Sequence, residues 1–284
     1  MNISIMKHLK PYHLVIVVLA FVLLRPAQAQ IYMGLHGSAV LPNQFYAESH
    51  MSDNEWMFTQ GSQHCAGAGL GWNAGLDVSW AMPFHTNLEA ILSADYLQNS
   101  MNKDVKQYYQ IRYSQRYSNC SHYEMKLPRF HHICVMAGMR YCFPMTTLFD
   151  LYGEALAGVN VRLINNWTLA YADEQWNPDG NPDIELHNNE SIKTYPTTTT
   201  FAFGVGAGFI IKKMVTVGVR YCMLGKAPLS WESTETVRYL VQNQVVSNTH
   251  TQHIDHYSIN PTMLTITLGF RLKAFGGARH VQDW

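Results

Sequence analysis

Apolar and polar residues alternate along much of this chain. From Ile133 to Phe143 every odd-numbered position is apolar, while the even-numbered ones hold small or polar residues such as Gly138 and Arg140. Side chains along a strand point alternately to opposite faces of a sheet. The stretch is therefore predicted to be a β-strand with one apolar face.

The same alternation predicts eight strands, and hence an all-β protein. They cover 31–41, 67–81, 86–98, 122–143, 148–163, 200–211, 214–224 and 262–275. Short connections (82–85, 144–147 and 212–213) alternate with long ones (42–66, 99–121, 164–199 and 225–261). This organisation is typical of a closed antiparallel up-and-down transmembrane β-barrel, with short periplasmic turns and long extracellular loops.

The N-terminal segment 1–29 has the features of a secretory signal peptide. Lys7 and Lys10 precede an apolar run at 14–24, and "AQA" at 27–29 fits a cleavage site before Gln30. A membrane anchor is the alternative. We expect an exported chain with a barrel over 30–275 and a short periplasmic tail over 276–284.

Composition narrows the function classes. Only 14% of residues are charged, and removing the three basic residues of 1–29 from the total of 20 leaves 17 against 20 acidic ones. That weak negative balance gives no nucleic-acid footprint. No stretch outside 1–29 reaches 18 consecutive apolar residues, so no helical span is expected.

A soluble lipocalin-like barrel or a β-sandwich is the competing fold. Nine glycines weigh against the soluble folds, because they lie on the polar face of the predicted strands. A surface that faces solvent gains little from so many glycines, whereas a narrow lumen needs them for space. They are Gly71, Gly75, Gly138, Gly158, Gly204, Gly206, Gly208, Gly218 and Gly269.

Charged residues share this predicted lumen face. "GMRYCF" at 138–143 is nearly repeated as "GVRYCM" at 218–223, and each copy turns one arginine inward. We expect an ionic network of Asp77, Glu89, Asp95 and Glu154 with Arg140, Arg162, Arg220 and Arg271. It is either a plug that holds the barrel closed or a charged conduction path. An eight-stranded barrel is only wide enough for side chains to fill, which favours the plug.

Several segments resemble those of small outer-membrane β-barrel proteins, particularly the Bacteroidetes type of Gram-negative bacteria. They are "AQAQ" at the cleavage site, "EMKLPRFHHICVMAGMRYCF", "LFDLYGEALAGVNVRL", "TFAFGVGAGFIIKKMVTVGVRY" and "TMLTITLGFRLKAF", and together they span most of 30–275. The resemblance implies location in the outer membrane, contact with its lipid, and insertion by the outer-membrane assembly machinery through the last strand. It implies no single activity and no cofactor.

Five cysteines are present, an odd number for an exported chain. Cys134, Cys142 and Cys222 face the predicted lumen on strands too far apart to be bridged, and we interpret them as small buried residues. Cys65 and Cys120 both lie on the predicted extracellular side. A disulfide between them would tie the first loop to the second.

Two loops carry weak metal-binding patterns. "NPDGNPDIE" at 177–185 places Asp179, Asp183 and Glu185 at alternate positions suited to Ca²⁺, although its prolines and glycine equally explain a turn. "HTQHIDH" at 250–256 includes His253, Asp255 and His256, which either bind a transition metal or lie in a solvated loop.

The predicted function is non-enzymatic: a structural or surface-binding barrel whose extracellular ligand or protein partner meets the loops. A narrow pore or small-solute transporter is the alternative, and a barrel enzyme the third, although no nucleophile–base pair supports it. The alternating stretch 231–246 is either a hairpin above the membrane or part of a ten-stranded barrel.

Overall fold

The fold is described from a computed structural model of the 284-residue chain. The structure describes residues 30–43, 46–47, 59–60, 63–64, 67–82, 85–104, 107, 120–127, 129–164, 167–174, 185–195, 197–241 and 244–275. The predicted signal peptide 1–29 and tail 276–284 lie outside these residues. Within them, no helix is long and apolar enough to cross a membrane.

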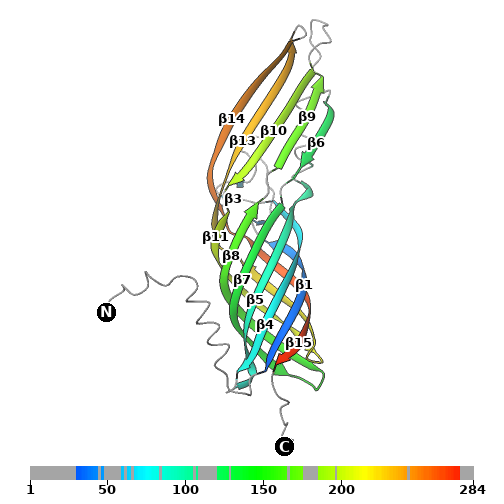
Figure 1. The fold of residues 1–284 in the computed structure, drawn as a ribbon, viewed down its shortest axis with the longest axis vertical. Helices are drawn as coiled ribbons and strands as arrows, with labels where there is room; N and C mark the ends of the chain where they lie inside the picture. The colour runs from blue at the N-terminus through cyan, green and yellow to red at the C-terminus, as the bar shows by residue number, and fades with distance from the viewer. Residues whose placement is uncertain are drawn as a thin grey trace, which may run out of the picture.

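Eight strands close into one antiparallel barrel (Figure 1). They are β1 (Ile31–Asn43), β4 (Ala68–Met82), β5 (His85–Met101), β7 (Arg129–Pro144), β8 (Phe149–Ile164), β11 (Thr198–Ile211), β12 (Val215–Met223) and β15 (Thr262–Phe275). Each pairs with the next barrel strand along the chain, and β1 closes the ring against β15, as in the pair Gly37↔Leu268. The predicted closed eight-stranded up-and-down barrel is confirmed.

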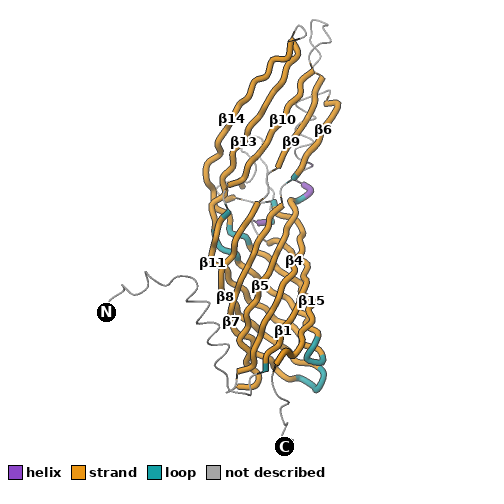
Figure 2. The backbone as a smooth tube through the Cα atoms, in the orientation of Figure 1, coloured by secondary structure: helices purple, strands orange, loops and turns teal. Residues whose placement is uncertain are grey.

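A second, five-stranded sheet extends beyond one end of the barrel (Figure 2). Its order is β14 (Gln244–Ile259), β13 (Ala227–Val241), β10 (Glu185–Tyr195), β9 (Trp167–Glu174) and β6 (Cys120–Lys126). A two-stranded hairpin, β2 (Thr59–Gln60) and β3 (Gln63–His64), forms a separate small sheet.

The second sheet corrects three sequence expectations. The predicted strand 122–143 is two strands, β6 and β7, separated at Leu127–Pro128, where proline has no N–H to donate to a ladder. The connection 164–199, expected to be a loop, contains β9 and β10. The stretch 231–246 lies in the β13–β14 hairpin outside the barrel, so the ten-stranded alternative is wrong.

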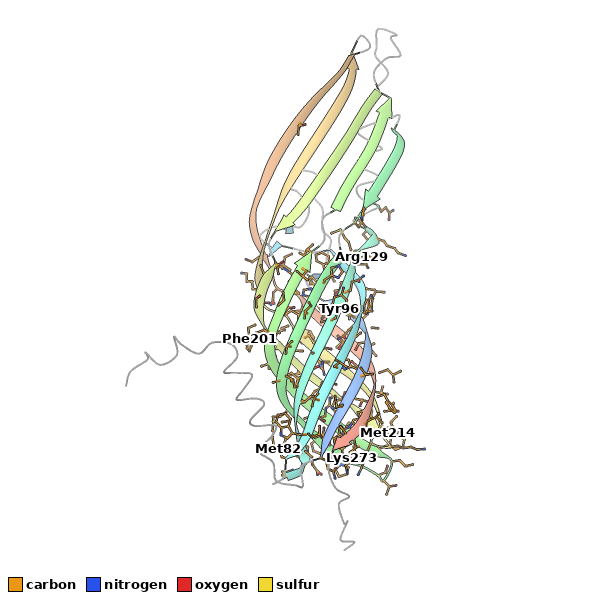
Figure 3. The ribbon with its side chains drawn as sticks, viewed as in Figure 1. Met82, Tyr96, Arg129, Phe201, Met214 and Lys273 are labelled. Atoms are coloured by element: carbon orange, nitrogen blue, oxygen red, sulfur yellow. The ribbon has the colours of Figure 1, made fainter. Side chains whose placement is uncertain are left out.

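The two ends of the barrel differ. At one end, here called the turn end, short connections join β4 to β5, β7 to β8 and β11 to β12, and both ends of the barrel chain, Ile31 and Phe275, pair with each other. The opposite end, here called the loop end, leads to the second sheet. Figure 3 places Met82, Met214 and Lys273 near the turn end and Arg129 at the loop end.

The outer surface of the barrel is apolar all the way round. Every barrel strand contributes large exposed apolar side chains, for example Leu35, Leu76, Leu92, Val135, Val159, Val205, Val219 and Leu268. None of these carries a charge, so the outward face would be poorly hydrated in water.

Aromatic residues mark both edges of this apolar surface. Towards the loop end the rings of Trp72 and Tyr96 lie 5.4 Å apart, and towards the turn end those of Tyr141 and Phe143 lie 4.4 Å apart. On β4, Trp72 and Trp80 are eight residues apart, which is roughly 27 Å along a strand at about 3.4 Å per residue.

Glycine residues allow strands β7 and β8 to lie close together. A Cβ on Gly158 would overlap the backbone carbonyl oxygen of Val135, and one on Gly138 would overlap that of Ala155. Gly153, on the same strand as Gly158, has nothing within 4 Å of the position its Cβ would take. Packing therefore requires glycine at the inward positions 138 and 158, and does not require it at the outward position 153.

We expect Gly158→Ala to destabilise the barrel by about 1–3 kcal/mol, because the added methyl group must displace a paired backbone. Gly153→Ala is the matched control and should leave stability unchanged. The measurement is the temperature at which the folded form is lost in heated and unheated gel-mobility assays. Equal transition temperatures for the two variants would contradict this account of the glycine.

Candidate functional site

Six ionisable side chains form a closed ring across the middle of the lumen, here called the ionic ring. Its members come from six different barrel strands: His36, Asp77, Asp95, Arg140, Glu154 and Arg220. Acids and bases alternate around it. The alternating pattern of each strand places these residues inward while their apolar neighbours face outward.

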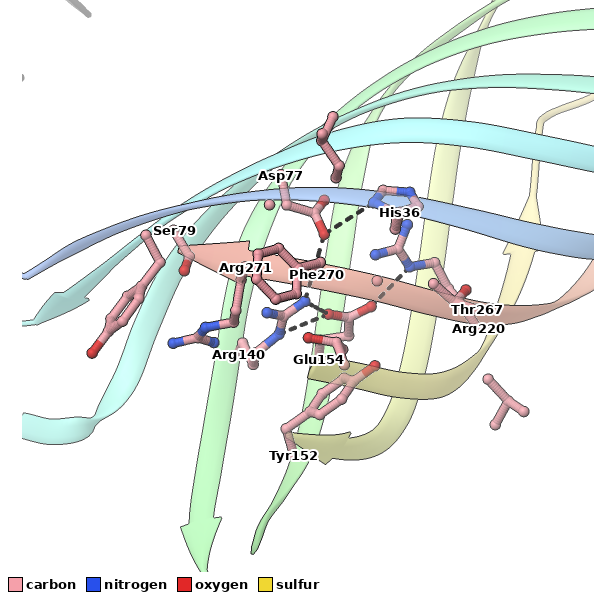
Figure 4. Close-up of a pocket in the computed structure, with 16 residues that line it drawn as sticks. His36, Asp77, Ser79, Arg140, Tyr152, Glu154, Arg220, Thr267, Phe270 and Arg271 are labelled. Atoms are coloured by element: carbon pink, nitrogen blue, oxygen red, sulfur yellow. Dashed lines mark hydrogen bonds and ion pairs between the residues drawn. The ribbon is translucent and has the colours of Figure 1, made fainter. Parts of the chain in front are cut away.

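Glu154 on β8 links the two arginines. Its Oε2 accepts hydrogen bonds from Arg140 Nε at 3.0 Å and Nη2 at 2.7 Å, and its Oε1 accepts one from Arg220 Nε at 2.8 Å. Figure 4 shows dashed lines joining Glu154 to Arg140 and to Arg220. Arg140 is only 3% exposed, and Glu154 and Arg220 are each 7% exposed. One carboxylate thus compensates two buried guanidinium groups, which suits the fork geometry of arginine.

Asp95 on β5 connects Arg220 to His36. Its Oδ2 lies 3.3 Å from Arg220 Nη1, and its Oδ1 lies 2.7 Å from His36 Nε2. Asn73 Nδ2 and Ser93 Oγ also donate to this carboxylate, at 2.9 Å and 2.7 Å. Asp95 therefore has four neighbouring polar groups although it is buried.

Asp77 on β4 completes the ring between His36 and Arg140. Its Oδ2 lies 3.3 Å from His36 Nδ1, at ion-pair distance but not aligned as a hydrogen bond, and 4.0 Å from Arg140 Nη2. His36 thus lies between two carboxylates. A proton on both of its nitrogens would give the ring three positive and three negative charges.

Glycine leaves room for the ring. A Cβ on Gly206 of β11 would lie 3.0 Å from Glu154 Oε1, and one on Gly269 of β15 would lie 3.0 Å from the Cβ of His36. These two strands contribute no ionisable residue to the ring. They instead provide the space into which the longer side chains extend.

A second ion pair lies nearer the turn end. Arg271 Nη2 and Nη1 donate to Glu89 Oε1 and Oε2 at 2.8 Å and 3.1 Å, a two-point contact. The Arg271 guanidinium also lies 4.0 Å from the centre of the Tyr32 ring. Both charged residues are buried.

The lumen is also closed at the loop end. Tyr46, from the segment after β1, is 1% exposed, and its hydroxyl lies 3.0 Å from His132 Nε2. His132 Nδ1 lies 3.2 Å from Asn160 Oδ1, and Asn160 Nδ2 donates to the Leu224 carbonyl at 3.1 Å. Arg162, which is 2% exposed, is paired with His132 across the β7–β8 ladder and so belongs to this level.

The eight residues expected to form one network therefore lie at three levels. The ionic ring contains five of them: Asp77, Asp95, Arg140, Glu154 and Arg220. Glu89 and Arg271 form the second ion pair, nearer the turn end. Arg162 lies near His132, at the loop end. Free space next to the ring amounts to about 20 Å³. That volume holds about one water molecule. At the level of the ring, the described side chains therefore leave no room for a larger solute.

Sequence reasoning missed His36, the only histidine in the ring, and Tyr46. The signal for His36 was present, because outward Met33 and Leu35 place residue 36 on the lumen face. The strand 31–41 was the weakest of the eight patterns, and its polar positions were not combined with the others. Tyr46 follows the strand, where no periodicity predicts a direction.

The remaining predicted sites are only partly within the described residues. Cys134, Cys142 and Cys222 are free thiols, the first and last buried and Cys142 half-buried. Cys65 lies outside the described residues, so its disulfide with Cys120 stays a prediction.

The metal candidates also stay predictions. Asp179 and Asp183 are outside the described residues, and Glu185 is described only as the first residue of β10. His253 pairs with Glu232 in the β13–β14 ladder, and Asp255 and His256 fall at its register shift. Within the part of the chain that the structure describes, no group of three His, Cys, Asp or Glu side chains is arranged so that it could hold a metal ion.

No protein-family model matches the sequence, and a search of the curated proteins finds no significant match. Several solved structures are similar at low identity. Neisserial surface protein A has 11% identity and a TM-score of 0.39, covering 86% of this chain and 98% of its own. The attachment invasion locus protein Ail of Yersinia pestis has 13% identity and a TM-score of 0.33, covering 87% of this chain and all of its own.

The outer membrane protein OprG of Pseudomonas aeruginosa likewise has 13% identity and a TM-score of 0.33, covering 87% of this chain and 98% of its own. These are loose similarities of architecture. No residue role is transferred from these proteins to this chain.

We expect Glu154→Gln to destabilise the protein by about 3–5 kcal/mol, since it leaves Arg140 and Arg220 short of a buried counter-charge. Asp150→Asn is the matched control, because it makes the same carboxylate-to-amide change on the same strand, at a half-buried position near the turn end. It should lower the free energy of unfolding far less. The measurement is the free energy of unfolding by urea in lipid vesicles, followed by tryptophan fluorescence. A Glu154→Gln variant as stable as Asp150→Asn would show that the ring does not hold the barrel together.

Proposed function

We propose that this chain spans the outer membrane as a closed, non-conducting barrel and acts at the cell surface through the sheet beyond its loop end. The observation that carries the proposal is the filled lumen. The ionic ring, the Glu89–Arg271 pair and Tyr46 occupy three successive levels, and the space beside the ring holds about one water molecule. The plug is thus favoured over the conduction path.

The outer surface supports a location in a membrane. An apolar, uncharged face encircles all eight strands, which is far more exposed apolar area than a soluble monomer normally carries. Closure of the barrel pairs the backbone groups that lipid cannot hydrogen-bond. Aromatic rings at both edges of the band are the arrangement expected at the two lipid–water interfaces.

The connections support an orientation. In outer-membrane barrels the short turns face the periplasm and the long loops face outward. The turn end of this barrel would therefore face the periplasm, and the five-stranded sheet would stand outside the cell. The β13–β14 hairpin runs from Ala227↔Ile259 to Val241↔Gln244, or roughly 50 Å at about 3.3 Å per residue.

The chemistry of the lumen supports a non-enzymatic role. His36 and the three carboxylates of the ring lie against one another or against arginines, and a substrate has no space to reach them. The charges of these groups compensate one another. The five-stranded sheet then offers a surface outside the cell to a ligand or protein partner, in the region where long extracellular loops were expected.

We expect the purified protein to give no conductance steps in planar lipid bilayers, with a general porin as the positive control. The reason is the filled lumen. Reproducible ion conductance that disappears in the Arg140→Ala or Arg220→Ala variant would instead establish a narrow pore and reject the plug.

We also expect an epitope inserted between Val241 and Gln244, the last pair of the β13–β14 ladder, to be detected by antibody on intact cells. Detection of the epitope only after the cells are opened would reverse the orientation.

We expect a chain in which 227–259 is replaced by a short glycine-rich turn to form the barrel still, because Leu224 N and Pro261 O already lie 2.8 Å apart. The measurement is the difference in gel mobility between heated and unheated samples of this shortened chain. Failure of the shortened chain to fold would show that the sheet is not a separate appendage.

A further inference from the structure

We propose that the adjoining β7–β8 and β11–β12 turns form a binding site for a glycerophospholipid with a net negative headgroup, such as phosphatidylglycerol. The phosphate binds at the two lysines of the β11–β12 turn, and the acyl chains lie against the barrel wall beside them. The inference rests on the proposed location of the barrel in a membrane. It adds a defined lipid ligand at the end of the barrel opposite to the proposed surface sheet.

Backbone hydrogen bonds join the two turns into one surface. Lys212 N donates to the Leu148 carbonyl across the two turns at 2.7 Å. Within the β11–β12 turn, Met214 N donates to the Ile211 carbonyl at 2.9 Å. Within the β7–β8 turn, the Thr146 hydroxyl oxygen accepts a hydrogen bond from Leu148 N at 3.2 Å. The exposed side chains of the two turns are therefore carried on backbone segments that hold each other in place.

The β11–β12 turn has two lysines in an unfavourable backbone conformation. Lys212 and Lys213 have φ values of 49° and 59°, in the left-handed region. Hairpin turns with two such residues strongly favour Asn-Gly and related pairs. The geometry of the turn therefore does not explain the lysines, and non-glycine residues held in this region are a reason to look for a function.

The two lysines give this surface its positive charge. Both are exposed, and neither side chain forms an ion pair with another described residue. Lys213 also lines a cavity of about 720 Å³ at the turn end, together with Asp150, which is half-buried. The lysine ammonium is a compact charge on a flexible four-carbon chain, so it can leave the rim of the cavity for a phosphate.

Apolar side chains lie beside the lysines. Met145 and Leu148 of the β7–β8 turn and Met214 after the β11–β12 turn are exposed (Figure 3), although turns usually carry polar residues. The outer wall of the barrel continues this surface two residues before the β11–β12 turn, where the ladder pair Phe209↔Val217 also has both side chains exposed. Cations next to an apolar wall match a lipid that carries its negative headgroup on acyl chains.

The two kinds of contact together select the ligand. A free phosphate ion uses the lysines but gains nothing from the apolar surface. A lipid without net charge uses the apolar surface but gains little from two cations. A glycerophospholipid with a net negative headgroup uses both.

The test counts the lipids that stay bound to the protein. Protein purified from membranes is placed in nanodiscs of equal parts phosphatidylglycerol and phosphatidylcholine with the same acyl chains, then released into detergent and analysed by native mass spectrometry. We expect phosphatidylglycerol to be retained in preference to phosphatidylcholine by about tenfold or more, because each lysine near a lipid surface attracts the negative headgroup.

Two results of this measurement would contradict the inference in different ways. Equal retention of the two lipids by a chain that has entered the nanodiscs would overturn the lipid site and leave the membrane location standing. A chain that does not enter the nanodiscs would contradict the membrane location, and the lipid site with it.

A second arm separates a lipid from a free phosphate. Glycerol 1-phosphate, which has the phosphate but no acyl chains, is added in large excess to the lipid-loaded protein. We expect the bound phosphatidylglycerol to remain, because the competitor makes no contact with the apolar surface. Complete displacement would show a site for free phosphate and overturn the assignment to a lipid.

Variants locate the site. The double variant Lys212→Asn, Lys213→Gly removes both cations and provides the residue pair that the turn favours. We expect it to fold at least as well as the unaltered protein and to lose the preference for phosphatidylglycerol. The double variant Lys103→Asn, Lys226→Asn is the matched control, since it removes two exposed lysines near the loop end, and should keep the preference. A preference that survives in the turn variant, or is lost in the loop-end control, would overturn the proposal.

Discussion

The width of an eight-stranded barrel governs the rest of this molecule. A sheet that closes with eight strands leaves an interior only just wide enough for side chains to fill. Here that interior contains arginines and carboxylates, and a buried charge without a partner costs several kcal/mol. The ionic ring avoids this cost, because each charged group in it lies next to a group of opposite charge. The glycines on β4, β11 and β15 follow from the same lack of space.

Pairing charges in the lumen also determines how the strands align. A strand that slips by one residue turns its whole inward set outward. For β7 such a slip would move Arg140 into the apolar surface and Met139 and Tyr141 into the lumen. Buried ion pairs are weak evidence for net stability. They do constrain the register of the strands, because each of six strands must place one ionisable group at the same height in the lumen. The ring therefore specifies the barrel as well as filling it.

The barrel was predictable from sequence because the strands carry an apolar outward face opposite a face of mainly small or polar residues. The level of each charge was not predictable. Arg162 and Arg220 both face inward, but their heights depend on strand tilt and stagger, which alternation does not encode. The second sheet was missed for another reason. In β9 the apolar alternation covers only Trp167, Leu169 and Tyr171, and β10 has no alternating apolar face at all. Such segments resemble loops until their partner strands are known. His36 was missed because it lies on the weakest pattern.

The chain positions of the ring residues have a consequence for how the protein is made. His36 lies on the first barrel strand and Arg220 on the seventh, and the pair that closes the cylinder joins residues more than 200 positions apart. No short segment can satisfy its own charges. Contacts of such long sequence separation form slowly, and until they form the acids and arginines must stay hydrated. Completion of the cylinder, exclusion of water and neutralisation of the lumen then become one late, cooperative event.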